Sequence, residues 1–241
     1  MNVFVVYGSK SDTQSYQPLV EGLNKDHKAS FEPISAHRQL PELIARLDKN
    51  DYDVVVAGAG LAAALPGVCA AKTKKIVFGV PVSANFGGID ALASIMQMPF
   101  GVPVITCGPN REDVIIEFLK SPKYKEKLKG INLVVRRNLL DFEFGYKEVN
   151  RAKEYAHSLE IPLKVSEKYD EEFFNIVLVN EEGDILKNKY CLHVPLLSDQ
   201  DKQDYTKILE LYSWTKQGGL WLGANNTKNA ILSVEKIYKE K

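Results

Sequence analysis

Three short stretches of the sequence carry side chains that could do chemistry on a small phosphorylated molecule. Each follows an apolar run typical of a buried strand: GSKSD follows residues 3–7, SAHR follows residues 29–34, and GAGL follows residues 52–57. A glycine turn between a strand and a helix points backbone N–H groups at one spot, which favours an anion such as phosphate. The sequence therefore predicts an anion-binding site, although a plain turn with a capped helix would leave the same pattern.

Polar side chains of these stretches suit different parts of such a ligand. Ser9, Ser11 and Ser35 can donate hydroxyl hydrogen bonds to a phosphate. Arg38 adds a planar fork of charged donors. Asp12 suits either the cap of the following helix or the hydroxyls of a ribose. Together they predict a grip on a phosphorylated sugar.

His37 is the candidate catalytic residue, because imidazole titrates near working pH and lies here between a serine and an arginine. The alternative is a histidine that only caps a helix. The other histidines, His27, His157 and His193, have no such context and are predicted to be structural. The remaining candidate binding residues offer backbone with little side chain, so that a ring could approach closely: Gly8, Ala36, Gly58, Ala59, Gly60 and Leu61.

Positioning these stretches requires strands that end at one edge of a sheet. Apolar runs and helical patterns alternate through the first 120 residues, with strands predicted at 3–7, 29–34, 52–57, 76–82 and 102–106. This alternation predicts an α/β fold with three αβα layers around a doubly wound, flavodoxin-like parallel sheet. Ligands of such sheets bind beyond the carboxyl ends of the strands, where all three stretches lie.

Five motifs, in order over residues 3–107, resemble one family of enzymes. They are GSKSD, SAHR, AGAGLAAALPG, GVPV and QMPFGVPV. Together they resemble class I phosphoribosylaminoimidazole carboxylase, also called N5-carboxyaminoimidazole ribonucleotide mutase, the PurE family. The resemblance implies carboxyl transfer on aminoimidazole ribonucleotide in de novo purine biosynthesis, with His37 moving the proton and with no cofactor or metal. Its implied partners are a ribonucleotide substrate and carbon dioxide or bicarbonate.

The chain departs from the family pattern at three positions. Ala64 replaces a histidine of the family's site, Leu61 replaces a typical glycine, and Phe100 stands where the residue is often polar or small. These changes keep two alternatives open: a catalytically weakened nucleotide-binding or regulatory protein, and a carboxylase that uses free carbon dioxide. A flavodoxin-like electron carrier is disfavoured, because the loop after residues 52–57 lacks aromatic residues for a flavin ring.

The strand pattern restarts after a polar segment. NLVVR (132–136), FNIVLV (174–179) and GLWLG (219–223) stand where the first, third and fifth strands stood, and helices are predicted at 146–160, 201–213 and 226–239. We therefore expect a PurE-like catalytic domain at 1–121, a linker at 122–130 and a degenerate, structural PurE-like domain at 131–241. In this second copy RNLLD, SEKY and NEEG replace the three chemical stretches. An unrelated second domain of the same class is the alternative.

The end of the second copy, GANNTKNAIL, resembles the end of the family's own sequence more closely than residues 108–119 do. Members of the resembled family are single-copy homo-octamers. A tandem chain would reproduce that particle as a homotetramer, a pseudo-octamer. The closing helix has apolar residues at helical spacing that need a partner surface: Ala230, Ile231, Val234 and Ile237. A monomer whose halves pack on each other is the alternative.

Composition excludes several classes of function. The 31 basic and 31 acidic residues balance, which argues against nucleic-acid binding or a polybasic membrane contact. Three single cysteines without CxxC spacing argue against structural zinc and a disulfide framework. The start has no signal-peptide pattern, and no apolar run approaches the roughly 20 residues of a membrane span. We expect a soluble, cytoplasmic protein.

Overall fold

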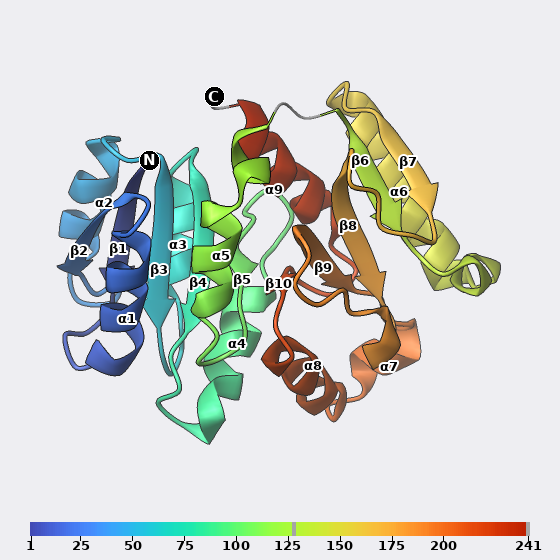
Figure 1. Ribbon diagram of the computed structural model, residues 1–241. Helices are drawn as coiled ribbons and strands as arrows, with labels where there is room; N and C mark the ends of the chain where they lie inside the picture. The colour runs from blue at the N-terminus through green and yellow to red at the C-terminus, as the bar shows by residue number, and fades with distance from the viewer. Residues whose placement is uncertain (127–128, 240–241) are drawn as a thin grey trace.

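A single sheet of ten strands runs through both halves of the chain (Figure 1). The computed structural model describes residues 1–126 and 129–239. Along the sheet the strands follow the order β2-β1-β3-β4-β5-β10-β9-β8-β6-β7. Helices cover both sides, which confirms the predicted three-layer α/β fold with a mostly parallel sheet.

The first half forms five parallel strands in the flavodoxin-like order 2-1-3-4-5. Its strands are β1 (Asn2–Tyr7), β2 (Lys28–Pro33), β3 (Val54–Ala59), β4 (Ile76–Pro81) and β5 (Ile105–Thr106). Its helices are α1 (Thr13–Leu23), α2 (Leu40–Asp48), α3 (Leu65–Lys72), α4 (Ile89–Met96) and α5 (Asp113–Lys120), with a 3-10 turn η1 (Phe86–Gly88) before α4. These elements lie close to the predicted ones, except that β5 is shorter than the predicted 102–106.

The second half repeats this strand order. Its strands are β6 (Ile131–Val134), β7 (Leu163–Ser166), β8 (Phe174–Val179), β9 (Cys191–Pro195) and β10 (Leu220–Trp221). Its helices are α6 (Glu143–Ser158), α7 (Asp199–Gln203), α8 (Lys207–Lys216) and α9 (Thr227–Lys239), and 3-10 turns η3 (Arg137–Asp141) and η4 (Glu182–Asp184) follow β6 and β8. The predicted helix 201–213 is instead two helices, because Asp204 is extended and its carboxylate accepts from the Thr206 N–H at 2.9 Å.

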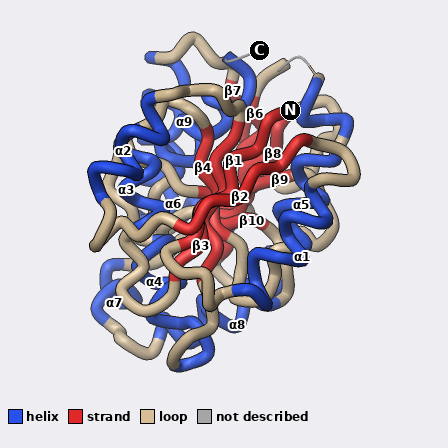
Figure 2. Tube along the Cα trace, turned by 90° about the vertical axis from the view of Figure 1, so that its left-hand side faces the viewer, coloured by secondary structure: helices blue, strands red, loops and turns tan. Residues whose placement is uncertain are grey.

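The two halves meet through one strand pair, and helices α4 and α8 also contact each other across the junction. Trp221 of β10 pairs with Thr106 of β5, antiparallel. Figure 2 shows α1 and α5 on one side of the strands, with α2, α3, α6 and α9 on the other. Part of the predicted linker forms a 3-10 turn, η2 (Pro122–Lys125), while residues 127–128 lie outside the described part.

Buried apolar side chains form a core that is continuous across this junction. Phe118 of α5 stacks on Tyr190 with ring centroids 4.2 Å apart and lies edge-on to Phe174 of β8. All three cysteines are free and buried. Within the described residues, no helix is long and apolar enough to cross a membrane.

Candidate functional site

The first candidate loop leaves β1 at the edge where β1 and β3 end together. The Gly8 N–H donates to the Gly58 carbonyl at 3.3 Å, which ties the two strand ends. Beyond Gly8, the Ser9 and Ser11 hydroxyls lie 2.7 Å apart, and the Ser11 N–H donates to Ser9 Oγ at 3.1 Å. Because only one of the two hydroxyl protons can lie between these oxygens, the other can point to a ligand.

Asp12 occupies the N-cap position of α1 but does not cap it with its side chain. Its backbone carbonyl accepts from the N–H groups of Ser15 and Tyr16, while no side-chain cap bond forms. Within residues 1–126 and 129–239, the carboxylate accepts a single, long hydrogen bond, from the Ser11 hydroxyl at 3.4 Å. Burial raises the pKa of Asp12 above its usual value, and the Ser11 hydrogen bond partly offsets that rise. The helix thus leaves this carboxylate available to a ligand.

The second candidate loop follows β2 as a tight turn. Ser35 is buried, its carbonyl accepts from the Gln39 N–H at 2.8 Å, and its own N–H donates to Gln39 Oε1 at 3.3 Å. This turn leaves His37 and Arg38 exposed to solvent. Arg38 reaches back to the first loop, where its Nη2 lies 3.5 Å from the Gly8 carbonyl oxygen. The charged side chain therefore lies beside the predicted phosphate position.

The third candidate loop follows β3 and needs close backbone approach. A Cβ on Gly58 would lie 2.2 Å from the Tyr7 ring, and one on Gly60 would lie 3.0 Å from Ala84 Cβ. Leu61 has φ +52°, the left-handed region that favours glycine, and 54% of its surface is exposed. Ala64 is the N-cap of α3 and has no side-chain group that could cap it.

These loops converge because β1 lies between β2 and β3 in the sheet. The structure therefore brings together the serines, Asp12, Arg38 and the glycine loop, with His37 next to Arg38 on the turn after the edge strand β2. Among the residues that the structure describes, no cluster of three or more His, Cys, Asp or Glu side chains could hold a metal ion. The arrangement offers hydrogen-bond donors, one carboxylate and one imidazole on an open edge.

The corresponding edge of the second half is occupied by its own ion pairs. Arg136, after β6, contacts Glu181 at 2.9 Å and Asp184 at 2.7 Å, and both acids follow β8. Glu167 after β7 accepts from the Arg137 N–H at 2.9 Å. A phosphate here would have to displace carboxylates from Arg136, so this edge lacks the chemistry of the first.

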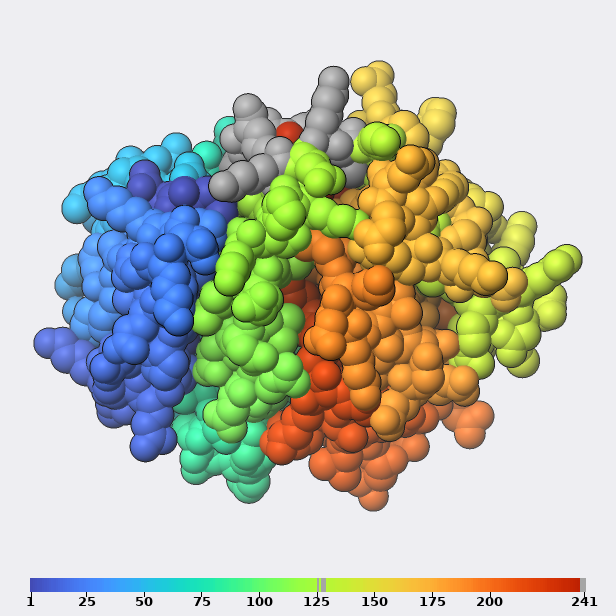
Figure 3. Space-filling view, in the orientation of Figure 1, coloured from blue at the N-terminus to red at the C-terminus, as the bar shows by residue number. Residues whose placement is uncertain are grey.

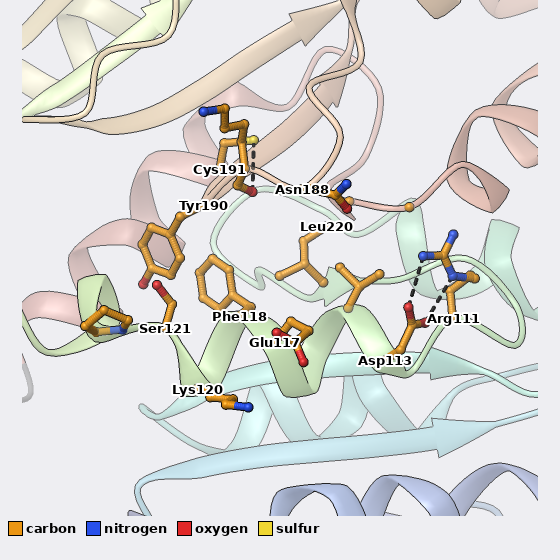
Figure 4. Close-up of a pocket in the computed structure, with 15 residues that line it drawn as sticks. Arg111, Asp113, Glu117, Phe118, Lys120, Ser121, Asn188, Tyr190, Cys191 and Leu220 are labelled. Carbon is orange, nitrogen blue, oxygen red and sulfur yellow. Dashed lines mark hydrogen bonds and ion pairs between the residues drawn. The ribbon is translucent and has the colours of Figure 1, made fainter. Parts of the chain in front are cut away.

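A separate pocket of about 640 Å³ lies between α5 and the strands of the second half. Figure 3 shows it as a hollow beside the green helix α5. In Figure 4, Phe118 and Tyr190 form one part of its wall, and Arg111 is engaged by Asp113. Arg111 also donates to the Lys216 carbonyl at 2.7 Å. This pocket follows the junction between the halves and lies away from the three loops.

A partly buried chain of polar side chains behind the first loop was not apparent from the sequence. The Tyr7 hydroxyl lies 3.1 Å from Ser15 Oγ, which in turn donates to Glu112 at the start of α5. Burial raises the pKa of Tyr7, so the phenol stays protonated. A tyrosine in an apolar strand is predicted to be a core residue, so no sequence pattern indicates this hydrogen-bonded link between β1, α1 and α5.

Comparisons with known proteins agree with the five motifs. The family profile described as AIR carboxylase matches residues 2–114. The N5-carboxyaminoimidazole ribonucleotide mutase of Methanocaldococcus jannaschii is 41% identical over 143 residues, covering 53% of this chain and 90% of that protein. The mutase of Pseudomonas aeruginosa is 38% identical over 153 residues, covering 58% and 93%.

Further matches extend the comparison. The mutase of Escherichia coli K12 is 48% identical over 111 residues, covering 43% of this chain and 64% of that protein. Among solved structures, Treponema denticola PurE is similar with a TM-score of 0.43 at 20% identity, covering 66% of this chain and 98% of that one. Because a relative 41% identical is matched over 90% of its length, this chain belongs to the AIR carboxylase family of enzymes.

Proposed function

We propose that this protein converts N5-carboxyaminoimidazole ribonucleotide to 4-carboxyaminoimidazole ribonucleotide in purine biosynthesis. The observation that carries the proposal is the convergence of three loops at one sheet edge, within the part of the chain that matches the AIR carboxylase family. The relatives named above carry this activity in their names. In this proposal a ribonucleotide is the ligand of the open edge.

The phosphate would bind between the first two loops. Backbone N–H groups after Gly8 and the hydroxyls of Ser9 and Ser11 supply neutral donors, and Arg38, next to Gly8, supplies the charge. Ser35 adds a further hydroxyl from the second loop. The Asp12 carboxylate, which α1 does not use, would accept from the ribose hydroxyls.

The third loop would bind the aminoimidazole ring. Gly58, Ala59 and Gly60 have little side chain, so the ring and the carboxyl group can lie directly on their backbone. Ala36 and Leu61 would border this ring site. The chain places Tyr7 and Ala84 against the other side of Gly58 and Gly60, which fixes the loop from behind.

His37 would move the single proton that the reaction requires. When the carbamate releases carbon dioxide, the exocyclic nitrogen gains a proton. When ring carbon C4 bonds to the carbon dioxide, C4 loses its proton. One imidazole can give the first proton and take the second, so His37 returns to its starting state. Its exposed position on the turn after β2 allows it to reach a ligand held by Arg38.

Ala64 favours two alternatives, because the family pattern has a histidine there. The site would then either carboxylate aminoimidazole ribonucleotide with free carbon dioxide, or bind a nucleotide without turnover in a regulatory role. An assay of the purified full chain with both substrates separates the three. Turnover of the N5-carboxylated ribonucleotide supports the proposal. Turnover only with carbon dioxide supports the first alternative, and binding without turnover supports the second.

We further propose that the halves arose by tandem duplication, with a catalytic domain at 1–121, a linker at 122–130 and a structural domain at 131–241. The repeated strand order and the ion-paired edge of the second half support this. Four chains would then form a pseudo-octamer in the cytoplasm. Light scattering tests the assembly: a mass of four chains supports it, and a fully active monomer contradicts it.

A further inference from the structure

The segment from Gln97 to Gly101, between α4 and β5, is held by hydrogen bonds from the far end of the chain. Asn226 Nδ2 donates to the Met98 carbonyl at 2.9 Å. Asn229 Nδ2 donates to the Pro99 carbonyl at 2.9 Å, and Asn229 Oδ1 accepts from the Gly101 N–H at 3.0 Å. The two asparagines thus bind three backbone groups of one short segment, an arrangement we call the asparagine clasp.

The clasp is fixed by its own surroundings. Asn229 is 1% exposed, in the first turn of α9, and its N–H lies 3.3 Å from Asn226 Oδ1. The backbone N–H of Thr227, the residue after Asn226, donates at 2.8 Å to the carboxylate of Glu148 on α6, which is 3% exposed. An acidic side chain at this helix end also matches the helix dipole. Because the first turn of α9 is anchored in this way, the asparagine amides have fixed positions.

The other side of the clasped segment contacts the element that follows the third candidate loop. A Cβ on Gly67 would lie 3.0 Å from Met98 Cε and 3.2 Å from its sulfur, so Met98 lies directly on the first turn of α3. Met98 also packs against the buried cluster that contains Ala59, Ala63 and Leu65. A shift of Met98 would therefore reach Gly67 directly and residues 59–65 through the buried cluster.

Phe100 adds an apolar contact to the clasp. Its ring lies edge-on to Tyr155 of α6, with centroids 5.2 Å apart, and Lys228 Nζ is 4.9 Å from the Phe100 centroid. Phe100, one of the three departures from the family pattern, therefore has a contact partner in the second half. The segment Gln97–Gly101 is thus contacted by α6 and α9 on one side and packs against α3 on the other.

We propose that Asn226 and Asn229 are positioning residues, which hold Gln97–Gly101 against α3 and thereby set the third loop for the ribonucleotide; this rests on the proposed function. The second half then completes the site without touching the ligand. It also gives a role to the GANNTKNAIL stretch, whose first asparagine, Asn225, serves a different contact. Asn225 bonds the Leu197 backbone at 2.7 and 2.8 Å, entirely within the second half.

Asn225 provides the matched control. Asn225 has φ +51°, so Asn225→Gly removes its two bonds without backbone strain, whereas Asn226→Ala and Asn229→Ala open the clasp. We expect amide exchange of residues 59–68 to become at least tenfold faster in both clasp variants and to stay unchanged in Asn225→Gly. We expect kcat/KM for the N5-carboxylated ribonucleotide to fall at least tenfold in the clasp variants, with thermal stability lowered no more than in the control.

A second pair of variants tests the path through Met98. Met98→Ala should reproduce the kinetic loss with the clasp intact, and Met98→Leu, which keeps the volume, should retain near-normal kinetics. The proposal would be overturned if the clasp variants matched Asn225→Gly in both the amide exchange of residues 59–68 and kcat/KM. It would also be overturned if this exchange became faster in the clasp variants while kcat/KM stayed unchanged. A wild-type protein inactive on every ribonucleotide would instead contradict the proposed function, while the exchange comparison would still decide whether the clasp holds the loop.

Discussion

Arg38 Nη2 lies 3.5 Å from the carbonyl oxygen of Gly8, although 30 residues separate them in the chain. This contact joins the turn after β2 to the turn after β1. It places the guanidinium beside Gly8, the residue directly before the Ser9–Ser11 hydroxyl pair. One cation and two hydroxyls therefore share the region where β1 ends.

Arg38→Ala should weaken ribonucleotide binding by about 2 kcal/mol, because it removes a charge-assisted donor to phosphate. Affinity for the aminoimidazole nucleoside, which lacks the phosphate, should change little. Isothermal titration of both ligands measures the difference. Arg38→Lys keeps the charge without the planar fork, so its affinity for the ribonucleotide should lie between those of the wild type and Arg38→Ala. Equal losses for nucleotide and nucleoside would remove Arg38 from the phosphate site.

His37→Asn should lower turnover by roughly 10²–10⁴-fold, the usual contribution of general acid–base catalysis. Ribonucleotide affinity should stay close to normal, because the phosphate donors are unchanged. Steady-state kinetics with a parallel binding measurement separates the two effects. His157→Asn, at an exposed position on α6, is the control and should leave turnover unchanged. Near-normal turnover of the His37 variant would exclude it as the proton carrier.

Leu61→Gly should raise the free energy of unfolding by about 1 kcal/mol, because a leucine at φ +52° is strained and glycine is not. The leucine side chain is 54% exposed, so little packing is lost. Leu61→Ala keeps the strain and should bring no gain. Urea unfolding of the three proteins tests this, and equal gains for alanine and glycine would contradict it.

Ala64→His should raise mutase turnover by roughly tenfold or more, if restoring an imidazole beside the ring site restores proton transfer. Ala64 is partly exposed and in helical conformation (φ −76°, ψ −25°), which histidine adopts without strain. Assays should use both the N5-carboxylated substrate and carbon dioxide with the uncarboxylated ribonucleotide. If turnover of one substrate falls in Ala64→His and turnover of the other does not rise, the wild-type site is adapted to the substrate whose turnover falls.

Acidification should destabilise the fold through His193, which is buried in β9. Burial lowers the pKa of His193 to about 4, and its hydrogen bonds with the backbone of Leu220 and Leu186 offset only part of that shift. In the unfolded chain the His193 imidazole takes up a proton near pH 6.5, whereas in the folded chain it does so only near pH 4. Stability should therefore fall as pH drops through this window, by about 3 kcal/mol in total.

A comparison of variants isolates this contribution. His193→Gln should show a flatter decline in the free energy of unfolding between pH 7 and pH 4.5 than the wild type, whatever its stability at pH 7. His157→Gln should keep the wild-type decline. Urea unfolding at several pH values measures both, and parallel curves for wild type and His193→Gln would contradict the assignment.

The sequence predicts the first half well, because its signals are local. Uninterrupted apolar runs mark β1, β3 and β4 as strands buried on both faces, and glycine marks where the first and third loops leave them. The convergence of the three candidate loops also follows, since parallel strands bring their carboxyl ends to one edge. The prediction that Leu61 stands at a glycine position also has a physical basis in its positive φ.

Other features depend on contacts between distant parts of the chain and could not be predicted. The sequence predicts strands at 102–106 and 219–223, but it carries no signal for their length of two residues, β5 and β10, or for the antiparallel pairing that joins them. The division between α7 and α8 depends on the turn at Asp204, inside a segment with a helical pattern. The asparagine clasp joins residues 128–130 positions apart, and only the likeness of GANNTKNAIL to the family's end hinted at it.

The position of β10 has a consequence for synthesis. It is the last strand to leave the ribosome, yet it lies at the centre of the finished sheet. Until Leu220 and Trp221 emerge, β5 is an open edge and the Gln97–Gly101 segment lacks its asparagines. The nascent chain thus carries every motif of the site early but cannot close the sheet around them. An open strand edge can pair with another chain, so the nascent protein is exposed to mispairing until β10 reaches β5.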